Sequence, residues 1–89
     1  MKTIKVNNCL EVPKNFIGTV EYLYGTKEWW VKGKLHREDG PAIEHENGLK
    51  EWWVEDILHR TDGPAVEYPN GSKEWWVEGK DYLEKDFNK

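Results

Sequence analysis

A short charged motif carries most of the chemistry that this chain offers. The motif is His-Arg-x-Asp-Gly, and its two copies are His36-Arg37 with Asp39 and His59-Arg60 with Asp62. A guanidinium binds a carboxylate or phosphate through parallel hydrogen bonds, so two stacked copies could form a cationic ledge for an anionic ligand. The alternative is internal: each Arg pairs with a nearby Glu, and each Asp accepts backbone N–H groups in its turn. The Arg partners could be Glu44 and Glu67 of the adjacent strands, or the column Glu28, Glu51 and Glu74.

Three Trp-Trp pairs provide a second candidate surface, at residues 29–30, 52–53 and 75–76. Neighbouring residues on a strand point to opposite faces, so one Trp column should line each face of a sheet. Either both columns are covered, or one is a recognition strip, since aromatic residues dominate binding hot spots. A homodimer would satisfy both interpretations, because six Trp exceed what so short a chain should cover. The candidate binding residues are therefore His36, Arg37, His59, Arg60, Trp30, Trp53 and Trp76.

The patterns typical of metal sites and nucleophilic catalysis are missing. His36 and His59 could face each other across two units, but no Cys or third His stands at a recognised ligand spacing. Cys9 lies outside the repeat with no indicated base, and no Gly-rich phosphate loop occurs. We therefore expect a protein without enzyme activity, metal or cofactor.

These residues recur because the chain repeats itself. Segments 25–47 and 48–70 align without a gap and share 15 of 23 positions, and a third copy begins at Gly71 and departs at Asp81. Such a period indicates an array of one small unit that must stack on its neighbours. Asn47-Gly48 and Asn70-Gly71 stand between segments of strand composition, which predicts β-hairpins. Asp56 replaces Gly33 in the second copy, so the corresponding turn is not expected to need a positive φ.

The predicted fold class is all-β: an antiparallel meander of about six strands, built from three repeated hairpins, with a short C-terminal capping helix. We expect a single domain over 1–89, with a lead-in segment at 1–15, hairpin repeats at 16–79 and a cap at 80–89. Ile4 and Val6 could form a lead-in strand. Asp81 could cap the terminal helix, which would place Leu83 and Phe87 on one face.

Composition narrows the class of partner. The 89-residue chain carries 17 acidic and 13 basic residues, a net charge of −4, which disfavours nucleic acid as a ligand. Its single Cys suits a reducing cytoplasm, and no apolar run reaches the length of a membrane span. We expect a soluble cytoplasmic protein that binds neither nucleic acid nor membrane directly.

The unit E-W-W-V-x-G-K-L-H-R-x-D-G-P-A resembles MORN repeats, which share its period. The matching positions are Trp30, Gly33, His36 and Gly40, then Trp53, Asp56, His59 and Gly63. Asp56 departs from that pattern, and Arg37 and Arg60 stand where MORN repeats usually have Gly. A closer likeness, over roughly 16–87, is to repeat proteins of the W-x-x-G-x-x-H-R-x-x-G-P-A type associated with phage and giant-virus genomes.

The resemblance implies a non-enzymatic binding protein, in the form of a small phage-encoded protein that inhibits a host protein in the host cytoplasm. An anti-CRISPR or another anti-defence inhibitor would be of this kind. Two alternatives stay open. One is a binder that sequesters an anionic small molecule or nucleotide at the His-Arg motifs. The other is a MORN-like lipid or scaffold module, against which the acidic balance counts.

Overall fold

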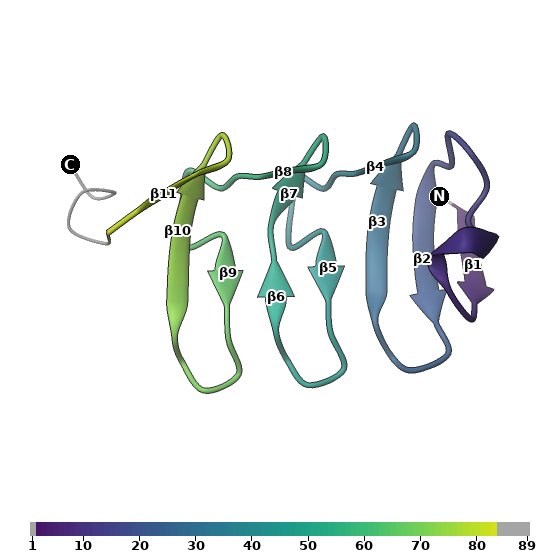
Figure 1. The fold of residues 1–89 in the computed structure, drawn as a ribbon, viewed down its shortest axis with the longest axis horizontal. Coiled ribbons are helices and arrows are strands. Elements are labelled where there is room, and N and C mark those ends of the chain that lie inside the picture. Colours follow the sequence, from purple (N-terminus) through teal and green to yellow (C-terminus); the bar gives the residue numbers. More distant parts are fainter. Residues whose placement is uncertain (1, 84–89) are drawn as a thin grey trace.

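The computed structural model describes residues 2–83 as a row of strands that runs from the N-terminal to the C-terminal end of the chain (Figure 1). One short 3₁₀ helix, η1 (Cys9–Glu11), follows the first strand. The strands are β1 (Lys2–Val6), β2 (Gly18–Tyr22), β3 (Lys27–Val31), β4 (Lys34–Leu35), β5 (Ile43–Glu44), β6 (Lys50–Glu51), β7 (Trp53–Val54), β8 (Ile57–Leu58), β9 (Val66–Glu67), β10 (Lys73–Val77) and β11 (Lys80–Tyr82).

The prediction of an all-β fold is confirmed, with antiparallel hairpins formed by β2–β3, β5–β6 and β9–β10. Neighbouring units join through β3–β5 and β6–β9. The sheet is mixed rather than wholly antiparallel, because β1 pairs with β2 in parallel. Residues 7–17 carry the chain back to the end of the sheet where β1 began, so β2 must run in the same direction as β1.

The segments between hairpins hold more strands than the expected six. After β3 the chain turns tightly and pairs β4 back onto it, and β7–β8 and β10–β11 repeat this arrangement (Figure 1). The turns are Lys32-Gly33, Glu55-Asp56 and Glu78-Gly79, and both residues of each have positive φ. Two successive positive φ values are typical of a type I′ turn, whose twist matches that of the strands.

Asp56 corrects the expectation that its turn needs no positive φ, since its φ is 65°. Asp is among the few residues that visit this left-handed region, because its short side chain can make local hydrogen bonds. Here the bond goes to the preceding unit: Asp56 Oδ1 accepts from the Leu35 N–H at 2.7 Å. The Asp56 N–H in turn donates to the Leu35 C=O at 2.9 Å. The Gly-to-Asp change therefore adds a link between units.

Substitutions of Asp56 should separate backbone strain from this hydrogen bond. We expect Asp56→Ala to lower the free energy of unfolding by about 1–2 kcal/mol, because the strain remains and the bond is lost. Asp56→Gly loses the same bond but relieves the strain, so it should stay within about 0.5 kcal/mol of the wild type. Urea unfolding measures both values. Equal losses for the two variants would show that the positive φ is not what selects the residue.

The turns of the β5–β6 and β9–β10 hairpins lie at Asn47-Gly48 and Asn70-Gly71, as the sequence predicts. Gly48 and Gly71 have φ of 97° and 93°, and Gly25 takes the same role in the first unit with φ of 104°. The Gly48 N–H donates to the His45 C=O at 3.0 Å, and Asn47 Oδ1 accepts from the Leu49 N–H at 3.0 Å. The Asn supports the loop through its side chain, while the Gly supplies the left-handed backbone.

Pairing register divides the side chains between two faces of the sheet. One row of paired residues defines face A and contains Ile4, Val20, Glu28, Ile43, Glu51, Val66 and Glu74. The next row defines face B and contains Lys5, Glu21, Lys27, Glu44, Lys50, Glu67 and Lys73. Directly paired residues share a face and alternate residues share a face. Trp30, Trp53 and Trp76 therefore lie on face A, and Trp29, Trp52 and Trp75 lie on face B.

Apolar burial is concentrated at the first unit. Val6, Phe16, Val20 and Tyr22 form the buried cluster, with Ile4, Val12 and Trp30 packed against it. The N-terminal segment therefore closes this end of the array by placing Val12 and Phe16 over face A. In the later units the buried apolar residues are small or β-branched: Ala42, Ile43, Ala65 and Val66.

The C-terminal end departs from the expected helix where the structure describes it. Asp81 lies within β11 and pairs with Trp76, so it does not begin a helix. Leu83 follows the strand, and Phe87 lies outside the described residues. The strand agrees with the repeat, because Lys80 and Asp81 occupy the register of Ile57 and Leu58. No helix among residues 2–83 is long and apolar enough to cross a membrane.

Candidate binding site

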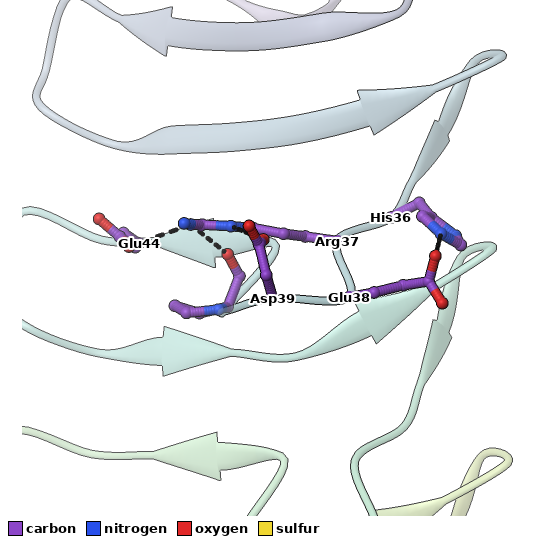
Figure 2. A network of polar contacts seen from close by, with 6 residues as sticks. His36, Arg37, Glu38, Asp39 and Glu44 are labelled. Carbon is purple, nitrogen blue, oxygen red and sulfur yellow. Dashed lines mark hydrogen bonds and ion pairs between the residues drawn. The ribbon is translucent and has the colours of Figure 1, made fainter.

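Arg37 lies at the centre of the first charged motif, where its side chain is 23% exposed. Its Nε donates to Asp39 Oδ1 at 3.0 Å, and its Nη1 donates to the Pro41 C=O at 3.1 Å and to Glu44 Oε2 at 3.4 Å (Figure 2). Its Cζ lies 4.0 Å from the centre of the Trp29 ring, which is cation–π contact. The guanidinium is thus held by polar groups in its plane and by an aromatic ring against its face.

Arg60 repeats this arrangement in the second unit. Its Nε donates to Asp62 Oδ1 at 2.9 Å, and its Nη1 donates to the Pro64 C=O at 2.9 Å and to Glu67 Oε2 at 3.2 Å. Its Cζ is 4.0 Å from the centre of the Trp52 ring. The Arg60 guanidinium beside Asp62 lowers the pKa of that exposed carboxyl. The expected pairing of the two Arg residues with Glu44 and Glu67 is confirmed, and each Asp accepts from the Arg of its own motif.

The Gly of each motif has no side chain, and this leaves space for the Arg side chain of the same motif. A Cβ on Gly40 would lie 2.9 Å from Arg37 Cζ, and a Cβ on Gly63 would lie 2.8 Å from Arg60 Cζ. Neither Gly has a positive φ, so backbone conformation does not explain its presence. The guanidinium lies close to the Gly while it stacks on the Trp. The absence of a side chain at this Gly therefore permits the close approach of the guanidinium.

Gly40→Ala should lower the free energy of unfolding by about 1 kcal/mol, because the added methyl group displaces the guanidinium from Trp29. In an Arg37→Ala background the same substitution should cost almost nothing, since the displaced group is gone. A double-mutant cycle followed by urea unfolding measures this coupling. The same cost in both backgrounds would mean that Gly40 is required for some other reason.

The His residues point away from the Arg residues, as Figure 2 shows for His36 and Arg37. His36 Nδ1 accepts from the Glu55 N–H at 3.1 Å, and its Nε2 lies 3.5 Å from Glu38 Oε2. His59 Nδ1 accepts from the Glu78 N–H at 2.9 Å. Each His therefore carries no proton on Nδ1 and links its own unit to the tight turn of the next.

The His and Arg side chains therefore do not form one row of positive charge, although His59, Arg37 and Arg60 all line one hollow. The His residues accept hydrogen bonds from the next unit, whereas each Arg bonds to residues of its own unit on face B. Among residues 2–83 no group of three or more His, Cys, Asp or Glu side chains could hold a metal ion.

The Glu column on face A binds Trp indoles rather than Arg, which corrects one of the two Arg pairings considered above. Trp Nε1 donates to the Glu two positions earlier at 2.9 Å, 3.0 Å and 2.9 Å in the pairs Trp30–Glu28, Trp53–Glu51 and Trp76–Glu74. Two residues apart on a strand is the spacing that keeps side chains on one face. The Glu-x-Trp pattern in the sequence is the signal for these bonds, although Arg was the partner expected for this Glu column.

Each of these Glu residues has a second partner from the adjacent strand of its hairpin. The Tyr22 hydroxyl donates to Glu28 Oε1 at 2.9 Å, and His45 Nε2 donates to Glu51 Oε2 at 2.6 Å. In the third unit Tyr68 donates to Glu74. Burial and the bond to Glu28 raise the pKa of Tyr22. The hydrogen bond to Glu74 raises the pKa of Tyr68, and the bonds from Tyr68 and Trp76 lower the pKa of Glu74.

These contacts leave all six Trp half-buried. Trp30, Trp53 and Trp76 are the predicted recognition strip, and their indole N–H groups are bonded within the chain. Trp29 and Trp52 are covered by Arg on face B. Neither column is a bare aromatic strip, and a binding surface must include the polar residues beside the rings.

A hollow lies between the two charged motifs. It has a volume of about 510 Å³, and we call it the corner hollow. Trp52 and Val54 are its apolar lining residues, and its charged lining residues are Arg37, Glu38, Asp39, Arg60 and Asp62. A smaller hollow of about 300 Å³ lies against Trp29 and Val31 of the preceding unit. Each of the two hollows therefore contains a Trp ring together with basic and acidic side chains.

Comparisons with protein-family models, with curated proteins and with solved structures each find no match to this chain. The likeness to MORN-type repeats therefore remains a prediction from the sequence. Its shared positions have clear structural roles here: Gly33 in a left-handed turn, His36 between units and Gly40 beside a guanidinium.

Proposed function

We propose that the protein is a noncatalytic binding module that engages another protein through the corner hollow. The observation that carries the proposal is the hollow itself, which two copies of one motif build around Trp52. Trp and Arg side chains are enriched at protein–protein hot spots, and both line this hollow. The repeat resemblance supplies the setting: a phage-type protein in the cytoplasm of its host, whose binding inhibits a host protein.

Charge favours a protein partner over an anionic small molecule. The hollow has two Arg but three acidic residues, Glu38, Asp39 and Asp62. Both guanidinium groups already face two carboxylates each. An anion would have to displace these carboxylates or approach a surface of net negative charge. A protein surface that offers a Lys or Arg together with an apolar side chain fits this lining better. The overall acidity also disfavours an anionic lipid surface.

A variant that fills the hollow provides the test. Thr61 is exposed and lines the hollow, so Thr61→Trp should block it without disturbing buried groups. Ser72→Trp adds the same side chain at an exposed position outside the hollow. With tagged protein in bacterial lysate, quantitative mass spectrometry should show a protein retained by wild type and Ser72→Trp, and at least about tenfold less by Thr61→Trp. Retention by all three, or native mass spectra with a bound small anion instead, would contradict the proposal.

We also propose a homodimer, on a smaller surface than the sequence suggested. The expectation assumed that six Trp could not be covered by one chain, whereas each is half-buried. The remaining exposed apolar residues include Ile57 and Tyr68 of the later units. Light scattering at high micromolar concentration should give the mass of two chains. A monomer at that concentration would show that the contacts within one chain are enough.

A further inference from the structure

β1 forms one end of the row of strands and offers an open edge (Figure 1). Within residues 2–83 it pairs with β2 on one side and with no strand on the other. The Val6 C=O accepts from the Leu23 N–H at 3.0 Å, so the backbone groups of Val6 point toward β2. In a parallel pair these directions alternate by residue. Thr3 and Lys5 therefore direct their N–H and C=O groups outward, at the spacing that an added strand requires.

The row on face B shows what side chain such a strand should offer. From β1 to β10 its members are Lys5, Glu21, Lys27, Glu44, Lys50, Glu67 and Lys73, so that every neighbouring pair joins opposite charges. Opposite charges stabilise a directly paired position, and like charges destabilise it. The row begins with Lys5, whose side chain is exposed. The next position outward, beyond the edge of the molecule, is therefore one that favours Asp or Glu.

We propose that the outer edge of β1 binds an extended acidic segment of a partner protein as an added β-strand. Main-chain hydrogen bonds to Thr3 and Lys5 provide the attachment, and an Asp or Glu opposite Lys5 provides the selectivity. Ile4 and Val6 on face A favour apolar residues on either side of that acid. The recognised pattern is thus apolar-acidic-apolar in an extended segment. This edge is separate from the corner hollow, so either proposal can fail without the other.

The β1 strand of a second copy of the chain does not fit this edge. β1 contains Lys2 and Lys5 and no acidic residue, so pairing of two β1 strands would gather four Lys along one seam. Like charges oppose such pairing. Exposed Lys residues on an edge strand also serve to prevent unwanted association. That protective role alone is the rival explanation, and it predicts no preference for an acidic strand.

The probe is the peptide acetyl-Thr-Val-Glu-Val-Thr-amide, which places Glu beside Lys5 and Val beside Ile4 and Val6. Its control has Lys in place of Glu. Amide hydrogen exchange, followed by NMR, reads the N–H groups of Thr3 and Lys5 directly. We expect exchange at both to slow about tenfold at saturation with the Glu peptide. The Lys peptide should bind at least about fivefold more weakly.

Three variants make the test decisive. Lys5→Glu should reverse the peptide preference, and Lys5→Gln should abolish it without placing a carboxylate beside Glu21. Lys14→Glu changes the net charge by the same amount as Lys5→Glu, but at an exposed residue outside β1. This variant should therefore keep the wild-type peptide preference. The proposal is overturned if neither peptide slows exchange at Thr3 and Lys5. Equal binding of both peptides to the wild-type protein overturns it as well, because Lys5 would then only protect the edge.

Discussion

Replacing Glu28 by Ala should lower the free energy of unfolding by about 3 kcal/mol, because two half-buried or buried donors lose their only acceptor. Glu28 Oε1 accepts from the Tyr22 hydroxyl and from Trp30 Nε1, both at 2.9 Å. Tyr22 is only 5% exposed, so water cannot replace the carboxylate without opening the core of the first unit. Urea unfolding followed by Trp fluorescence measures the loss. In a domain of this size it corresponds to a fall in melting temperature of roughly 15 °C.

Two comparisons show whether unpaired donors cause this loss. Glu28→Gln keeps an oxygen acceptor at the same place, so it should retain more than half of the stability that Glu28→Ala loses. Glu74→Ala removes the equivalent acceptor from Trp76 and Tyr68, but Tyr68 is 37% exposed and can bind water instead. Its effect should be clearly smaller. Equal losses for Glu28→Ala and Glu74→Ala would contradict the burial argument.

Local sequence signals predicted the repeated hairpins well. Asn47-Gly48 places its turn correctly because the Asn side chain and the Gly backbone act within a few residues of each other. The pairing of Arg37 with Glu44 was also foreseen as one of two options. Both follow from short separations along the chain, where composition determines geometry with little help from the rest of the fold.

Contacts between units were harder to predict. Asp56 looked like a residue that relaxes its turn, yet it adopts a positive φ and bonds to Leu35 of the preceding unit. Asp81 looked like a helix cap, yet it pairs with Trp76 because the repeat register continues through it. In both cases the local propensity was overridden by hydrogen bonds to a neighbouring strand, β4 for Asp56 and β10 for Asp81. β4 and β8 are only two residues long, so an alternating pattern of polar and apolar residues could not predict them.

Charge pairing across the sheet shows how register and function are linked. The Glu column of face A and the Lys-Glu row of face B alternate along the same strands, so a slip by one residue would bring Glu28 to face B and Lys27 to face A. Glu28 would then lose the Tyr22 hydroxyl, which comes from the neighbouring strand, and Arg37 would lose the Trp29 ring. The charged motifs therefore specify the register that creates the corner hollow. A binding surface built in this way depends on residues that stabilise the fold.

Arg37→Ala and Arg60→Ala test that dependence, and each should lower the free energy of unfolding by about 2 kcal/mol. An exposed ion pair contributes 1 kcal/mol or less, but these side chains are about four-fifths buried and each stacks on a Trp. Loss of the guanidinium also uncovers Trp29 or Trp52. Arg37→Lys should recover less than half of the loss, because an ammonium group cannot bond Asp39, Pro41 and Glu44 in one plane while it stacks.

The same variants separate a structural Arg from one that binds a partner. If the Arg residues act only within the chain, a partner retained by the wild-type protein should bind the folded Arg37→Ala variant with less than about a threefold loss of affinity. A tenfold loss or more, under conditions where the variant is folded, would mean that a guanidinium contacts the partner directly. Glu28→Ala is the matched control, since it also lowers stability but lies on face A, outside the lining of the corner hollow. A stability loss below about 0.5 kcal/mol for Arg37→Ala would contradict the structural role, because it would equal that of an ordinary surface ion pair.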